Sequence, residues 1–178
     1  DYSSGFGQVK VYEFDSIVYQ QKGYSLYGLN YGAFGTALSL NHSGNILAIS
    51  APLKDEEHTI VSRLTSTNHM TSIGEIKVYE WDEVYMDWNQ KGTKITGEGA
   101  NEKFGVNICL NSDGTILAAK GYLDTNIENY SINRKNYVKV YRWNNINSDW
   151  VQLGETLYGR SGIDLRDTYY EFNNTGTG

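Results

Sequence analysis

One nine-residue pattern occurs three times in this chain of 178 residues and constrains its fold more than any other feature. The copies are GQVKVYEFD from Gly7, GEIKVYEWD from Gly74 and NYVKVYRWN from Asn136, so they begin 67 and 62 residues apart. Matching blocks accompany them in a fixed order: QQKGYSLYG, NQKGTKITG and VQLGETLYG follow the three copies, and FGTALSLNHSGNILAIS matches FGVNICLNSDGTILAAK 70 residues later. The chain is an internal duplication in which each copy forms one structural unit.

Each full unit is predicted to form four short strands, and no stretch of the chain shows a convincing helical period. The first strand, FGVNICLN, leads into Ser112-Asp113-Gly114, and Asp-Gly between apolar runs predicts a hairpin because glycine adopts the positive φ that tight turns need. TILAAKGY is the second strand. A long polar connection leads to the third, IKVYEW, which is rich in β-branched and aromatic residues, and the fourth lies around NQKGTKITG.

The third strand is apolar on both faces. Side chains alternate along a strand, so Ile76 and Val78 point to one side while Tyr79 and Trp81 share the other. A four-stranded sheet that is apolar on both faces must be covered on both, and we expect neighbouring sheets to stack face to face.

The unit boundaries predict an incomplete ring of blade-like sheets. Residues 1–28 form a half repeat with strands three and four, 29–97 and 98–159 form full repeats, and 160–178 form a partial repeat or tail. Closed propellers have about four to eight blades, so this chain does not close a ring alone. Three interpretations stay open: a fragment of a longer propeller, closure through several copies, or half-units that complete each other between chains.

Composition excludes several classes of function. The 21 acidic and 15 basic residues give a net charge of −6, which argues against a nucleic-acid or anionic-membrane surface. No apolar run approaches the roughly 20 residues of a membrane-spanning helix. Cys109 is the single cysteine, so an internal disulfide is excluded, and the repeat places it where the earlier copy has Ser39. The start at Asp1 indicates a processed product or a fragment.

No catalytic, metal or cofactor site is predicted. The histidines His42, His58 and His69 share no ligand spacing, and no nucleophile elbow or phosphate loop is present. The acidic cluster KDEEH at 54–58 has no counterpart in the next repeat, so a solvated loop explains it better than a cation site.

Candidate interaction and modification residues lie in the long connections and turns. The connections before the third strand differ between units, and variable loops on a rigid scaffold commonly carry binding. In the segment 121–136 we predict contacts from Tyr122, Tyr130, Arg134 and Lys135. Sequons occur at Asn41, Asn129 and Asn173, about as many as chance predicts, and we expect Asn41 and Asn129 on exposed turns where glycosylation can occur.

The chain resembles the FG-GAP-like and WD-like β-propeller repeats of secreted and cell-surface proteins. The residues that carry the resemblance are Trp88, Gln90, Gly92, Ile95, Gly97, Phe104, Gly105, Leu110 to Gly114, Ile116 to Ala118, Val78 and Tyr79. The resemblance covers roughly residues 7–159 and implies extracellular adhesion or scaffolding more often than catalysis. The turns LNHSGN and LNSDGT lack the aspartates of an integrin-type calcium loop, so calcium binding is not carried over.

These observations together predict a non-enzymatic, extracellular or cell-surface module that associates with itself or with neighbouring repeats through sheet edges and loops, as in a filament or surface appendage. The alternative is a carbohydrate-binding propeller, because sugars stack on aromatic side chains. Trp81 and Trp88 match Trp143 and Trp150 in the next repeat, and residues locked to a repeat are more often core. No nucleic-acid partner and no membrane insertion are expected.

Overall fold

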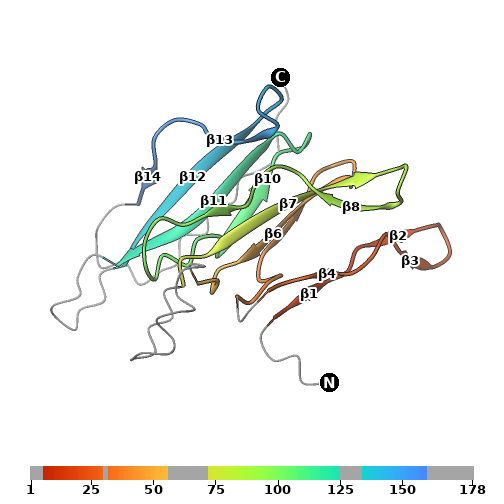
Figure 1. Ribbon diagram of the computed structural model, residues 1–178, viewed down its shortest axis with the longest axis horizontal. Coiled ribbons are helices and arrows are strands. Elements are labelled where there is room, and N and C mark those ends of the chain that lie inside the picture. The colour runs from red at the N-terminus through yellow and green to blue at the C-terminus, as the bar shows by residue number, and fades with distance from the viewer. Residues whose placement is uncertain (1–5, 30–31, 56–71, 125–133, 160–178) are drawn as a thin grey trace.

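The computed structural model describes residues 6–29, 32–55, 72–124 and 134–159, and it confirms an all-β fold for them, without a helix (Figure 1). The strands are β1 (Gln8–Val9), β2 (Tyr12–Phe14), β3 (Tyr19–Gln21), β4 (Leu26–Tyr27), β5 (Leu38–Leu40), β6 (Ile46–Ala51), β7 (Glu75–Asp82), β8 (Asp87–Gln90), β9 (Ile95–Thr96), β10 (Asn107–Leu110), β11 (Ile116–Asp124), β12 (Arg134–Asn144), β13 (Asp149–Gln152) and β14 (Leu157–Tyr158).

The strands form two equivalent sheets and one half-sheet, all antiparallel. The middle sheet has the order β5-β6-β7-β8 with β9 also paired to β7, and the C-terminal sheet has the order β10-β11-β12-β13 with β14 also paired to β12. The N-terminal half-sheet consists of two short ladders, β1–β4 and β2–β3. The repeated pattern of the sequence thus corresponds to β7, β12 and the pair β1 and β2.

The strand count differs from the prediction. Each complete sheet has five strands, because the segment predicted as strand four turns sharply at Lys91-Gly92 and returns to pair again with strand three. Gly92 adopts a φ of +76°, which favours glycine. The sheets remain open, and no closed barrel is formed within the described ranges.

The sheets stack face to face in chain order, as the strand alternation predicts (Figure 1). From the middle sheet, Leu47, Ile49, Tyr79 and Trp81 pack in one core cluster with Val9 of the half-sheet. On its opposite face, Ile46, Ala48, Ile76 and Val78 pack with Leu110, Leu117, Phe104 and Tyr141 of the C-terminal sheet. The middle sheet is therefore covered on both faces, whereas each end of the stack has one outer face.

Two strands extend into the segment predicted as a variable loop. Strand β11 continues to Asp124 and β12 begins at Arg134, with Leu123 opposite Lys135 and Asp124 opposite Arg134. The extended pairing places Tyr122, Arg134 and Lys135 in strands and not in a loop. The residues between these strands lie outside the described part of the chain.

Candidate functional site

The most distinctive polar structure in the molecule is a joint between neighbouring sheets that occurs twice. A three-residue turn of one sheet, Lys22-Gly23-Tyr24 or Lys91-Gly92-Thr93, packs against a tryptophan pair and an aspartate of the next sheet. We call each of these arrangements a joint turn on a tryptophan pair. The two copies provide an internal check, because the same contacts recur with different surroundings.

The tryptophans of each pair lie opposite one another on adjacent strands. Trp81 faces Trp88 with ring centroids 5.5 Å apart, and Trp143 faces Trp150 at 5.6 Å, both at an interplanar angle of 64°. Edge-to-face rings of this kind attract each other because the positive edge of one meets the negative face of the other. The pair therefore forms a fixed platform for the turn of the preceding sheet.

One indole of each pair binds the main chain of the joint turn. Trp88 donates its Nε1–H to the Lys22 carbonyl oxygen at 2.9 Å, and Trp150 donates to the Lys91 carbonyl oxygen at 3.0 Å. Both indoles are buried. Since a buried N–H group without a partner costs free energy, this bond fixes the turn on the pair.

An aspartate beside the pair accepts hydrogen bonds from the same turn. Asp87 Oδ1 accepts from the Tyr24 amide at 2.9 Å, and Asp149 Oδ1 accepts from the Thr93 amide at 2.8 Å and from its hydroxyl at 2.9 Å. Although partial burial acts in the opposite direction, the hydrogen bonds from Thr93 lower the pKa of Asp149 below its usual value. The carboxylate is thus held in its charged form at the joint.

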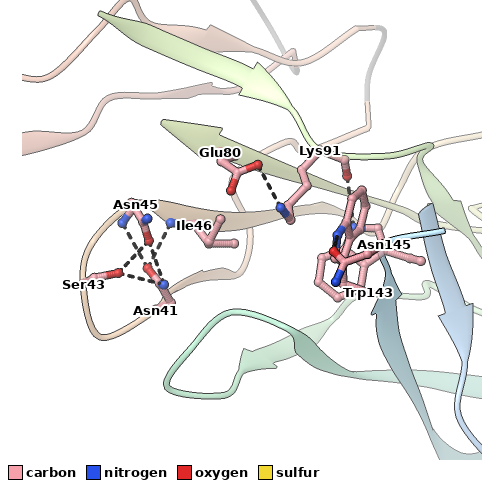
Figure 2. Close-up of polar contacts among 9 residues, drawn as sticks. Asn41, Ser43, Asn45, Ile46, Glu80, Lys91, Trp143 and Asn145 are labelled. Carbon is pink, nitrogen blue, oxygen red and sulfur yellow. Dashed lines mark hydrogen bonds and ion pairs between the residues drawn. The ribbon is translucent and has the colours of Figure 1, made fainter. Parts of the chain in front are cut away.

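A lysine of the joint turn lies over the outer ring of the pair. Lys91 Nζ is 4.4 Å from the centroid of the Trp143 ring and 2.8 Å from Glu80 Oε2; Figure 2 shows these side chains. Lys22 repeats the arrangement with Trp81 at 4.9 Å and Glu13 at 3.7 Å. The ammonium group is attracted to the face of the indole, and Glu80 or Glu13 supplies its counter-charge.

The glycine of the joint turn is required by contact as well as by conformation. A Cβ atom at Gly92 would lie 2.8 Å from both Asp149 Oδ1 and Trp143 Cζ3, and one at Gly23 would lie 2.8 Å from Asp87 Oδ1. Real Cβ atoms do not approach heavy atoms this closely. The glycine allows the backbone to reach the pair.

Asn41 is a structural residue of the β5–β6 turn (Figure 2). Its side chain is buried: Oδ1 accepts from the amides of Asn45 and Ile46, while Nδ2 donates to Ser43 Oγ and Asn45 Oδ1. The expectation of an exposed sequon at this position is therefore wrong as to exposure. Glycosylation at Asn41 stays a prediction, as it does at Asn129 and Asn173, which lie outside the described residues.

A buried polar group ties the 98–102 segment to β12. Tyr137 donates its hydroxyl to Glu102 Oε2 at 2.7 Å, Glu102 also accepts from the Glu98 amide, and Lys139 forms an ion pair with Glu98. Burial, followed by the hydrogen bond to Glu102, raises the pKa of Tyr137 far above its usual value. The group holds its protons tightly and serves to anchor the segment.

The predicted interaction residues do not form one site in the described structure. Tyr122 is half-buried in β11, with Lys120 Nζ 5.3 Å from its ring centroid. Arg134 and Lys135 contribute backbone pairing to β12, and Tyr130 lies outside the described residues. In the 54–58 acidic cluster, Lys54 is buried and Asp55 accepts from the Ser72 amide at 2.9 Å, while the rest lies outside the description.

Other features bear on chemistry. Cys109 is a partly buried free thiol. Among the described residues, no group of three His, Cys, Asp or Glu side chains is placed to hold a metal ion, and every buried side-chain nitrogen or oxygen has a hydrogen-bond partner. No helix that could cross a bilayer occurs in the part of the chain described.

The joint was missed by sequence reasoning, although one signal of it is present. Asp-Trp occurs at Asp87-Trp88 and at Asp149-Trp150, in both cases 62 to 65 residues after a Lys-Gly or Gly-containing turn. In the first copy Val18-Tyr19 replaces it. No protein-family model matches this chain, and a comparison with curated proteins finds no significant match.

Proposed function

We propose that the chain is a non-enzymatic structural and adhesive repeat module that works outside the cell or at its surface and associates with further repeats, as the subunit of a filament or surface appendage. The observation that carries the proposal is the joint. One set of contacts connects sheet to sheet twice in succession, so the chain is built from surfaces that recognise another unit of the same kind.

The unpaired backbone at one end supports the same proposal. Within the described residues, β1 pairs only with β4 and β2 only with β3. In the middle sheet the equivalent strand β7 also pairs along its other side with β6. An open strand edge is a template for pairing with another chain, and it adds sheet-edge association to the contacts between sheet faces.

A propeller-type arrangement of the sheets belongs to this proposal. The resemblance to FG-GAP-like and WD-like repeats supports it, as does the stacking of sheets that are apolar on both faces. A closed ring would require additional sheets from further copies or from additional repeats.

Mass photometry and sedimentation velocity over a concentration series test self-association, and negative-stain electron microscopy identifies filaments or rings. We expect concentration-dependent species larger than the monomer. A well-folded monomer at every concentration would contradict self-association. Immunolabelling of intact, non-permeabilised cells of the source organism tests the surface location separately.

Carbohydrate binding is the second candidate, supported by exposed tyrosines on the N-terminal half-sheet. Tyr12, Tyr19, Tyr24 and Tyr27 are all exposed, whereas Trp81, Trp88 and Trp150 are buried in the stack and are not available to sugars. A glycan array that shows saturable binding, lost on substitution of Tyr19 and Tyr24 by alanine, would favour this function over assembly.

A further inference from the structure

The C-terminal sheet contains a third joint turn, Leu153-Gly154-Glu155, which is formed like the other two. Gly154 adopts a φ of +74°, beside +75° at Gly23 and +76° at Gly92. The Leu153 amide donates to the Val140 carbonyl at 2.7 Å, as the Lys91 amide donates to that of Val78 at 2.8 Å. The side chain of the preceding glutamine bonds the glycine carbonyl in all three copies. This turn is pre-organised for a tryptophan-type pair.

No pair lies against this third turn in the described structure. A Cβ atom at Gly154 would meet nothing within 4 Å, in contrast to Gly23 and Gly92. The surrounding apolar face is uncovered as well: Leu157 is 59% exposed where its equivalent Ile95 is 8% exposed, and Val138 is only half-buried where Ile76 is fully buried.

The opposite end of the stack presents the complementary surface without a turn on it. Phe14 and Tyr19 face each other across β2 and β3 with centroids 5.0 Å apart, in the place that Trp81 and Trp88 occupy in the middle sheet. Phe14 is 55% exposed and Tyr19 is 73% exposed, whereas both tryptophans are buried. An aromatic pair of this size left in water is typical of an interface.

The residues that differ from the internal joints differ in a matched way at the two ends. Leu153 replaces the lysine of the internal turns, and Phe14 replaces the tryptophan under that lysine. Val18 stands where Asp87 and Asp149 accept hydrogen bonds. Both ends have exchanged a polar joint for an apolar one, which is the pattern expected if Leu153 packs on Phe14 of another molecule.

We propose that a second copy of this chain docks head to tail, with its Phe14–Tyr19 pair on the Leu153-Gly154-Glu155 turn of the first. This inference rests on the proposed assembly function and specifies its interface as a sheet face rather than a sheet edge. The contact is heterologous, since the two molecules use different surfaces, and each docking leaves one open surface of each kind. Assembly therefore continues until the free ends meet or remains open.

Two single substitutions that each block one end provide the test. Phe14→Glu places a charge on the aromatic pair, and Leu153→Glu places one on the turn; both side chains are exposed in the monomer, so folding is expected to persist. We expect each variant alone to be monomeric where the wild type assembles. An equimolar mixture retains one intact surface of each kind, and we expect it to form dimers and nothing larger.

Val84→Glu and Ile146→Glu are the matched controls, because they also introduce a charge at exposed apolar positions but lie in the β7–β8 and β12–β13 turns. Both should assemble as the wild type does. If the wild type assembles but the Phe14→Glu and Leu153→Glu variants do so equally, this interface is wrong and self-association stands. If the wild type stays monomeric, both the interface and the proposed function are wrong. Circular dichroism of each variant verifies its fold.

Discussion

Trp150 of the C-terminal sheet donates its indole N–H to the main-chain carbonyl oxygen of Lys91 in the middle sheet, 3.0 Å away. Trp88 makes the same bond to Lys22 one sheet earlier. A side chain that reads a main-chain carbonyl is indifferent to the side chain of the residue it binds, so the joint tolerates sequence change in the turn while it fixes the position of the turn.

Replacement of Trp150 by phenylalanine should destabilise the protein by at least about 1 kcal/mol, because the Lys91 carbonyl loses its donor and the ring shrinks in a buried site. Urea unfolding followed by circular dichroism measures the change. Trp143→Phe serves as a comparison, since Trp143 donates to the exposed Asn145 instead. Equal losses for both variants would contradict a specific role for the inter-sheet bond.

Gly92→Ala and Gly154→Ala form a matched pair. Both glycines have nearly the same positive φ, so each substitution incurs a backbone penalty of about 1–2 kcal/mol. Only at Gly92 would the new methyl group collide with Asp149 and Trp143. We expect Gly92→Ala to lower the free energy of unfolding clearly more than Gly154→Ala does, in urea titrations of the monomer. Comparable losses would show that the joint yields easily.

Asp149→Ala should cost about 1 kcal/mol at neutral pH, at the lower end for bonds to a charged group because the carboxylate is only partly buried. The pKa of Asp149 in the folded protein lies below its usual 3.8. Its contribution is therefore complete above about pH 4 and is lost as the pH falls through the lower folded value. The stability difference between wild type and variant should shrink accordingly in acid. A difference independent of pH would exclude a role for the charge.

Alkaline pH should weaken the stack through its buried tyrosines. Burial, with a smaller effect of nearby glutamates, raises the pKa of both Tyr79 and Tyr141 from 10.0 to about 12. Stability is then complete below pH 10 and falls as the pH rises towards 12, by about 1.4 kcal/mol per pH unit for each tyrosine. Comparison of urea unfolding for wild type and Tyr79→Phe across this range isolates one residue. Parallel pH profiles would contradict the shift.

Asn41 should remain unmodified in the folded protein even in a eukaryotic secretory host, because both ends of its amide are bound within the turn. Intact mass before and after deglycosylation, compared with Ser43→Ala, which removes this sequon alone, provides the measurement. A mass decrease of one glycan in the Ser43→Ala variant would show that Asn41 is modified before the turn closes.

Alternation along the strands was enough to predict the stacking of sheets. Ile76 and Val78 do contact one neighbour while Tyr79 and Trp81 contact the other, because a strand leaves no other way to bury both sets. The short strand β9 could not be predicted, since a two-residue strand carries no period. The joint escaped for a different reason: half of it is main chain, which has no signature in the sequence.

The interpretation of the repeated tryptophans as core residues is confirmed for Trp81, Trp88 and Trp150. The candidate contacts Tyr122, Arg134 and Lys135 depended on the length of a loop, and strands β11 and β12 take up much of that segment. Polar residues did not reveal this extension, because pairing between two long edges is decided by register and not by local composition.

Two consecutive joints with the same turn, the same pair of rings and hydrogen bonds of 2.9 and 3.0 Å relate each sheet to the next by nearly one screw operation. Repetition of a screw operation generates a helix whose pitch and radius follow from that single step, and a circle arises only when the rise per step is zero. The dimensions of any larger array of these sheets are thus set by the seating of a three-residue turn.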